Sequence, residues 1–328
     1  MREAAVTLGA VTPLAVGGPR GAAAAEGFRV PSIRGGLHWW FRAAWGGTEA
    51  PAELLEAERA VFGGGTAGST VDLWVSAGAL TERSVYVRMN DPKPVELSSG
   101  RTAVPTRRAH DAGGQATLHM RFRPHVPPAA REQFLGSLKL LCLLGGIGGR
   151  WRRGFGSVWP VGADASWAAP IGGEDLPQRA QWLEQHVHAA VAAVRPARAG
   201  TPRPSQASGI RVLRADSARL FLVEPRNGSW KSWEEAMDAL RDDFYRRLKG
   251  EFTKWFGLKI ESIGRIKPER QPSPIIIQIK PTKWGGLVGV VLVLFSEAIE
   301  AGMGSRWAAW DQANISALNL AVQKVALP

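Results

Sequence analysis

The stretch Ile33-Arg-Gly-Gly-Leu-His-Trp-Trp-Phe-Arg-Ala-Ala-Trp45 has the periodicity of an amphipathic helix with an unusually bulky apolar face. The apolar side chains that recur at helical spacing are Ile33, Leu37, Trp40, Phe41 and Ala44. We expect Ser32 to cap this helix and Gly46 and Gly47 to end it. Because so large a stripe must be buried against a second layer, the helix belongs to the core of a domain.

Strand and helix signals alternate on both sides of this helix. The expected elements are strands at Val6–Val11, Val71–Ser76, Thr117–Phe122 and Ser157–Val161, and a second helix opened by Pro127 and Pro128 and ended by Gly145. Together with the first helix they follow the order βαββαβ, which is the ferredoxin-like, RRM-like arrangement. We therefore expect an α+β domain over residues 1–165.

A long insertion, residues 79–116, separates the second and third of these strands. It contains a possible strand at Val85–Arg88 and then a polar, basic stretch that we expect to lie outside the core, so that residues 96–114 could be deleted without unfolding the domain. Insertions of this length are usually functional or disordered. The neighbours His110 and Asp111 could serve acid–base chemistry, but a polar loop tip is the simpler interpretation.

The second half of the chain repeats much of this pattern. After a helix at Gln178–Val194 and a linker to Gly209, the expected elements are a strand within Arg211–Val223, a helix from the capping box Ser232–Glu235 to Lys249, strands at Ile275–Ile279 and Leu287–Phe295, and a terminal helix from about Ser305. The βαββα order predicts a second ferredoxin-like domain over residues 210–328, with residues 166–209 as helix and linker. The fold class is therefore α+β with two tandem ferredoxin-like domains.

The composition favours a polyanionic partner. The 328 residues include 41 Lys and Arg against 29 Asp and Glu, a net charge of +12, which suits nucleic acid, although anionic lipid or acidic protein remains possible. The single cysteine, Cys142, excludes an intrachain disulfide and fits a reducing cytoplasm. The apolar run at Leu287–Phe295 is far shorter than the ~20 residues that span a bilayer, and Glu3 argues against a signal peptide. We expect no membrane association and no cofactor.

Two segments carry candidate binding residues. The first is a second stripe on the Ile33–Trp45 helix, formed by Arg34, His38, Arg42 and Trp45, which could hold phosphates and a stacked base. An ordinary solvated basic face is the alternative. Gly35 and Gly36 each cost about 1 kcal/mol of helix stability relative to alanine, which indicates the close approach of another backbone or a ligand.

The second segment is the glycine-rich stretch 145–158, with six glycines and three arginines in its first twelve residues. Glycines such as Gly146 and Gly148 let a polyanion approach the backbone, and the arginines supply charge. The glycines lack dinucleotide-binding spacing and no Gly-Lys-Ser/Thr element occurs; a flexible connector is the alternative. The RNA-binding candidates are Arg34, His38, Arg42, Trp45, Arg107, Arg108, Gly146, Gly148, Arg150, Arg152, Arg153 and Phe155.

These two segments resemble the RAMP superfamily, the repeat-associated RNA-binding proteins of CRISPR systems. The stretch 145–158 looks like the RAMP glycine-rich loop, and the Ile33–Trp45 helix resembles the signature of the first-numbered RAMP subunits of type III-B Cmr effector complexes. Thr12-Pro-Leu14, Gly17-Gly18 and Ser273-Pro-Ile275 are similar to further segments of those subunits. His38, Gly149 and Trp151 depart from the pattern.

The resemblance implies a ribonucleoprotein subunit in antiviral defence. Such a subunit would bind the guide RNA (crRNA) near its 3′ end, pack beside other RAMP subunits and help to capture complementary single-stranded target RNA. We expect no catalysis by this chain, since the sequence has no metal-binding Cys pair, His-Glu-x-x-His or Gly-x-Ser-x-Gly motif. A metal-independent endoribonuclease of the same superfamily and a basic scaffold that binds only proteins are the alternatives.

Overall fold

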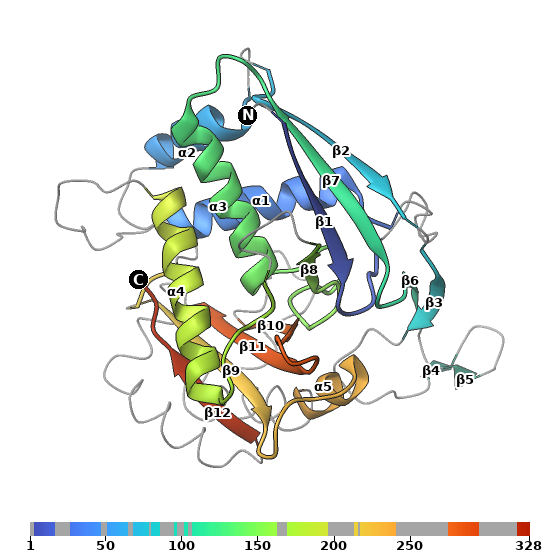
Figure 1. Cartoon of the computed structure of the whole chain (residues 1–328). Helices are drawn as coiled ribbons and strands as arrows, with labels where there is room; N and C mark the ends of the chain where they lie inside the picture. Colours follow the sequence, from blue (N-terminus) through green and yellow to red (C-terminus); the bar gives the residue numbers. More distant parts are fainter. Residues whose placement is uncertain are drawn as a thin grey trace.

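Two four-stranded antiparallel sheets organise the computed structural model of the chain (Figure 1). The structure describes residues 3–16, 27–46, 51–64, 68–78, 80–85, 95–96, 102–103, 107–162, 169–195, 213–215, 217–240, 275–294 and 320–328. The expected domain boundaries near residues 165 and 209 lie outside these ranges. Both sheets have the strand order of a ferredoxin-like fold, which confirms the predicted fold class.

The N-terminal sheet has the order β2-β7-β1-β8. Its strands are β1 (Glu3–Ala10), β2 (Val71–Ala77), β7 (Gln115–Phe122) and β8 (Val158–Val161). Along β7 the odd-numbered residues are partly or fully exposed and the even-numbered residues are buried, so one face of the sheet meets the core and the other does not. All four strands lie within three residues of their predicted positions.

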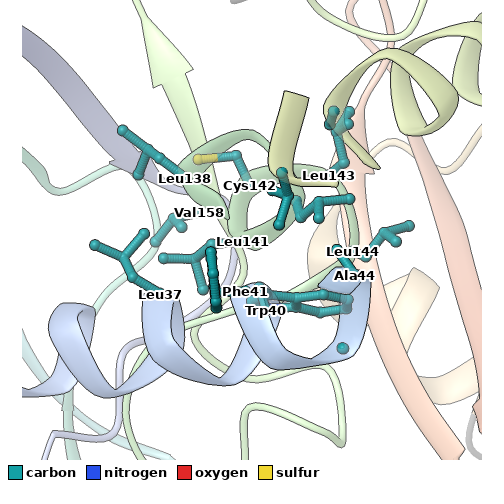
Figure 2. Packing of buried hydrophobic residues seen from close by; sticks show 14 of the residues in the cluster. Leu37, Trp40, Phe41, Ala44, Leu138, Leu141, Cys142, Leu143, Leu144 and Val158 are labelled. Carbon is teal, nitrogen blue, oxygen red and sulfur yellow. The ribbon is translucent and has the colours of Figure 1, made fainter. Parts of the chain in front are cut away.

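Helices α1 (Val30–Trp45) and α3 (Pro128–Leu144) pack on the inner face of this sheet. Figure 2 shows Leu37 and Phe41 of α1 against Leu138 and Leu141 of α3. The expected apolar stripe of α1 is buried, and Gly145 ends α3 as predicted. The prediction of Ser32 as a cap is wrong: Arg29 occupies the N-cap position and Ser32 lies in the first turn behind Pro31.

One helix of this domain was not predicted. Helix α2 (Pro51–Phe62) follows α1 and buries Leu54, Val61 and Phe62 in the same core. Its polar side chains, Glu58 among them, meet the outer side of α1. This helix determines what the basic stripe of α1 can do.

The insertion forms two small two-stranded sheets. They pair β3 (Glu82–Val85) with β6 (Arg107–His110), and β4 (Val95–Glu96) with β5 (Thr102–Ala103). His110 is buried and its backbone exchanges two hydrogen bonds with Leu14, and Gly113 and Gly114 bond the end of β1. The expectation that residues 96–114 lie outside the core is therefore wrong at their C-terminal end.

The second sheet has the order β10-β11-β9-β12. The elements of this domain are β9 (Ala218–Pro225), α5 (Trp233–Ala239), β10 (Ile275–Pro281), β11 (Leu287–Leu294) and β12 (Leu320–Val325). Ser232 caps α5, as predicted, by accepting a hydrogen bond from the Glu235 amide. Strand β12 was not predicted; the extension of α5 beyond residue 240 and the terminal helix from Ser305 fall outside the described residues.

Helix α4 (Leu176–Val194) joins the two halves of the molecule. It packs against α3 of the first domain and against β9 and β12 of the second (Figure 1). Asp175 caps it by accepting a hydrogen bond from the Gln178 amide at 2.8 Å. Arg179 and Glu224 form a buried ion pair of 2.6 Å between α4 and β9, which fixes the helix against the second sheet.

Candidate nucleic-acid interface

The glycine-rich loop is a fixed part of the fold. Its two limbs pair with each other, since the Ile147 amide donates to the Gly156 carbonyl at 2.8 Å. They also bind the segment that follows β1: Gly149 donates to the Ala15 carbonyl at 2.6 Å, and Gly156 donates to the Pro13 carbonyl at 2.9 Å. A flexible connector would make no such network, so that alternative is wrong.

The same loop is attached to the second domain. The Ile277 amide of β10 donates to the Arg152 carbonyl at 3.0 Å, and the Gln278 side chain donates to the Trp151 carbonyl. Next to these contacts, the fully buried Lys280 Nζ donates to the Gly145 carbonyl at 2.8 Å and lies 3.3 Å from the Val158 carbonyl. Burial lowers the pKa of Lys280 to about 7. The loop thus stands at the seam between the two domains.

A cleft of about 350 Å³ lies between this loop and the N-terminal half of α1. Its lining residues are Val16, Pro31, Ser32, Gly35, Gly36, Trp39, Gly146, Gly148, Gly149, Trp151 and Arg152. A Cβ atom added to Gly35 would have no neighbour within 4 Å, whereas one on Gly36 would lie 3.0 Å from the Leu141 side chain. Gly36 therefore serves helix packing, and Gly35 leaves backbone open to the cleft.

Two tryptophans and an arginine form one wall of the cleft. The Trp39 and Trp151 rings meet edge to face with centroids 5.5 Å apart. The Arg152 guanidinium lies 5.3 Å from the Trp39 ring and 5.2 Å from the Trp151 ring. Burial lowers the pKa of Arg152, yet arginine stays protonated at any physiological pH. The wall thus combines a positive charge with aromatic surface, as single-stranded RNA sites do.

The predicted stripe Arg34, His38 and Arg42 faces α2 instead of this cleft. Arg34 donates to the Phe62 carbonyl at 2.9 Å, His38 Nδ1 lies 2.6 Å from Glu58, and Arg42 Nε lies 2.9 Å from the same carboxylate. These side chains hold α2 on α1. The stripe is therefore occupied by protein partners, since two of its three donors share one carboxylate and the third binds a carbonyl. Its role in phosphate binding stays a prediction, and the Arg42 side chain is 50% exposed.

Glu58 is held as a carboxylate by this arrangement. Burial alone would raise its pKa, but hydrogen bonds from His38 and Arg42 outweigh that effect and keep the pKa of Glu58 below its ordinary range. Its side chain is only 5% exposed. The cluster is a structural ion pair between α1 and α2.

Two predicted aromatic contacts are also corrected. Trp45 is 6% exposed and stacks on Phe41 with ring centroids 5.4 Å apart. Phe155 is 3% exposed and belongs to the core of the second domain, with Met237 and Ile277. Neither ring is accessible to a base. Sequence periodicity placed Trp45 on the polar face of α1, but in the structure it belongs to the first hydrophobic core.

The remaining predicted residues lie in the glycine-rich loop and in β6. Gly146 and Gly148 do line the cleft, together with Arg152. Arg150, which has a positive φ of 63°, and Arg153, which is bridged to Ile277 of β10, belong to the same loop. Arg107 and Arg108 are placed in β6, but their side chains are outside what the structure describes.

The sequence interpretation missed the two residues that shape the cleft, Trp39 and Trp151. One signal for them was present: Gly35 lies one helical turn before Trp39, so an open backbone position and an aromatic ring share a face. His110 cannot act as the exposed acid–base partner of Asp111, since it is 3% exposed and its Nε2 accepts a hydrogen bond from the Gly27 amide. The interpretation of the pair as a loop tip is wrong for His110.

Within the described ranges, no cluster of three His, Cys, Asp or Glu residues has a metal-binding arrangement. Nor do those ranges contain a helix long and apolar enough to cross a bilayer.

Comparisons with known proteins agree with the fold. The RAMP superfamily profile matches residues 7–159, and no curated protein sequence matches. The fold is similar to that of Cmr1 from Pyrococcus furiosus in its apo form, with a TM-score of 0.58, 18% identity and coverage of 99% of both chains.

It is also similar to a chain of the type III-B Cmr-beta complex bound to cognate target RNA, with a TM-score of 0.61 at 12% identity over 95% of this chain and 98% of that one. A second Cmr-beta structure, bound to cognate target RNA and AMPPnP in the presence of single-stranded DNA, gives a TM-score of 0.57 at 12% identity over 89% and 94% of the two chains.

Proposed function

We propose that this chain, which carries a RAMP-superfamily domain at residues 7–159, is a non-catalytic guide-RNA-binding subunit of a type III-B CRISPR complex. It would hold the crRNA near its 3′ end, pack beside other RAMP subunits and help to capture complementary single-stranded target RNA. The likeness to Cmr1 and to Cmr-beta chains over nearly the full length supports this assignment.

The observation that carries the proposal is the cleft between α1 and the glycine-rich loop. It joins open backbone at Gly35 to the Trp39, Trp151 and Arg152 wall. Aromatic faces stack on bases of any sequence, and arginine binds phosphate with charge-assisted hydrogen bonds. A site of this kind suits a guide whose sequence varies, since none of these groups reads a base edge.

The absence of catalysis is part of the proposal. The two titratable groups at the contact between the helices, His38 of α1 and Glu58 of α2, bind each other. His110 is enclosed. The described residues offer no exposed pair of acid and base around the cleft, which favours binding over the endoribonuclease alternative.

Binding can be tested with arginine variants of the loop. Replacing Arg150, Arg152 and Arg153 with alanine should weaken binding to every single-stranded RNA and reduce the log–log salt slope by about 2, at ~0.7 for each lost phosphate contact. Arg59→Ala and Arg226→Ala, which change exposed arginines on α2 and after β9, serve as controls and should keep the wild-type slope. Fluorescence anisotropy against salt concentration gives both quantities.

The enzyme alternative is tested in the same preparation. Labelled guide and target RNA incubated with the protein, with and without EDTA, should remain intact. New fragments that persist in EDTA would establish a metal-independent nuclease, and a wild-type affinity in the triple variant would remove the loop from the RNA site.

A further inference from the structure

The outer face of the N-terminal sheet carries an exposed aromatic pair. Trp74 of β2 lies on this outer face and is 42% exposed. Its neighbours in the strand, Leu73 and Val75, lie on the inner face and pack against the core. His119 of β7 stands opposite Trp74 in the sheet register. The two rings are stacked: their planes are nearly parallel, with an angle of 4° between them, and their centroids are 5.0 Å apart. None of the helices α1, α2 and α3 covers this face, since their core lies on the other side.

The neighbours of the pair hold it in place and leave it polar. Ser76 Oγ lies 2.7 Å from His119 Nε2, which fixes the imidazole ring. Arg121 lies with its guanidinium 5.9 Å from the Trp74 ring and binds Asp72 at 3.1 Å. Arg123 binds the same carboxylate at 3.2 Å. A preorganised aromatic surface costs little side-chain entropy when a flat ligand stacks on it.

The chemistry of this face favours nucleic acid over protein. Trp74 is the one large apolar side chain that the described residues of β1, β2 and β7 turn outward, whereas the buried centre of a stable protein interface is mostly apolar. The Thr7 and Thr117 hydroxyls, 2.9 Å apart, continue the polar surface along the strands. RNA-recognition modules with a four-stranded sheet bind single-stranded RNA by stacking bases on exposed rings, and the net charge of +12 attracts a polyanion to the whole chain.

A hollow lies at the other end of the same surface. It has a volume of about 680 Å³, and its walls include Gly9 and Gln115, which are paired in the register of β1 and β7, and Leu287 of the second domain. His119 and Gln115 are four residues apart on one strand, or about 13 Å. A single-stranded RNA that stacks a base on Trp74 and runs along β7 would therefore reach this hollow.

We propose that the outer face of the N-terminal sheet is a second RNA-contacting surface, at which Trp74 and His119 stack a base of single-stranded RNA. It lies on the opposite side of the sheet from α1, so it is distinct from the cleft; the proposal rests on the RNA-binding function proposed above. Stacking carries the recognition here, because Glu3, which stands opposite Arg121, and Asp72 balance the charges of Arg121 and Arg123.

Because of this charge balance, RNA binding at the two surfaces should differ in its dependence on salt concentration. Contacts to phosphate release counterions and depend on salt, whereas stacking on a neutral surface does not. Trp74→Ala should weaken binding to a short single-stranded oligouridine about tenfold, by the same factor at low and high salt. Trp74→Phe should restore part of the loss. Trp284→Ala, which removes a 61% exposed tryptophan from the β10–β11 turn, is the matched control and should bind as wild type.

Circular dichroism and thermal unfolding check that Trp74→Ala remains folded, as expected for an exposed side chain. A photocrosslink between 4-thiouridine RNA and the peptide that contains Trp74 or His119 supplies direct support. Wild-type affinity of Trp74→Ala, with binding still lost in the loop arginine variant, would overturn this inference and leave the proposed function standing.

Two other outcomes also overturn the inference. If wild-type protein binds no RNA, the proposed function fails with it. If Trp74→Ala keeps its RNA affinity but no longer co-purifies with a neighbouring subunit, the face is a protein interface.

Discussion

The buried Lys280 makes the stability of the protein depend on pH in a defined window. Its side chain is fully buried at the seam between the domains and donates to the Gly145 carbonyl. Burial lowers its pKa from 10.5 to about 7, whereas an unfolded chain retains the ordinary value. Between these two pH values the unfolded state binds the extra proton, so the free energy of unfolding rises with pH.

The magnitude follows from the shift. Each pH unit contributes at most about 1.4 kcal/mol for one proton, and with half of the folded molecules still protonated at pH 7, the gain between pH 7 and pH 9 is about 2 kcal/mol. Cys142 limits the pH range in which the effect of Lys280 can be measured. Burial raises the pKa of its thiol to about 12, so above the pKa of the unfolded thiol its contribution to stability falls as pH rises.

Urea denaturation at pH 7, 8 and 9 tests this reasoning. Lys280→Met removes the titrating group, so the wild-type gain of about 2 kcal/mol should disappear from the variant. The variant should also be less stable at pH 9, because the Gly145 and Val158 carbonyls lose a donor. Lys283→Met, in the nearby β10–β11 turn, should retain the wild-type pH dependence. Equal pH dependence in wild type and Lys280→Met would refute the assignment of the effect to Lys280.

Two further substitutions test the α1–α2 contact and the glycine-rich loop. Glu58→Gln should lower the free energy of unfolding by about 1–2 kcal/mol in urea titrations, because the charge-assisted bonds from His38 and Arg42 are lost; unchanged stability would mean that these contacts are not formed. Gly148→Val should cost about 2 kcal/mol or more, since Gly148 has a φ of 86° and a Cβ would lie 3.0 Å from the Ala15 carbonyl. A melting temperature of Gly148→Val equal to that of the wild type would contradict the positive φ of Gly148.

The sequence predicted most strands and the core helices because their signals are local. The stripe of α1, the proline and glycine ends of α3 and the apolar runs of β10 and β11 each fix an element without reference to the rest of the chain. Helix α2 and strand β12 were not predicted because α2 has a mixed polar surface and only the two ends of β12, Leu320 and Val325, are buried. Their positions depend on the neighbours that they cover.

The surroundings of the candidate binding residues were harder to predict than the fold. Periodicity showed that α1 has a basic stripe, but it could not show that an unpredicted helix would accept hydrogen bonds from Arg34 and Arg42. The glycine-rich loop was correctly identified as a conformationally special segment. Its partners, residues 13–15 and β10, are more than a hundred residues away along the chain, and pairings at that distance leave no local signal.

The attachment of the glycine-rich loop to β10 would link the proposed RNA binding to the relative position of the two domains. The carbonyl of Arg152, whose side chain lines the cleft, accepts a hydrogen bond from the Ile277 amide. A change in cleft width must therefore displace either this bond or the second sheet. By thermodynamic reciprocity, a neighbouring subunit that binds the second domain would change the affinity for RNA by a certain factor, and RNA would change the affinity for that subunit by the same factor. Assembly and guide capture would then be two measurements of one coupling energy.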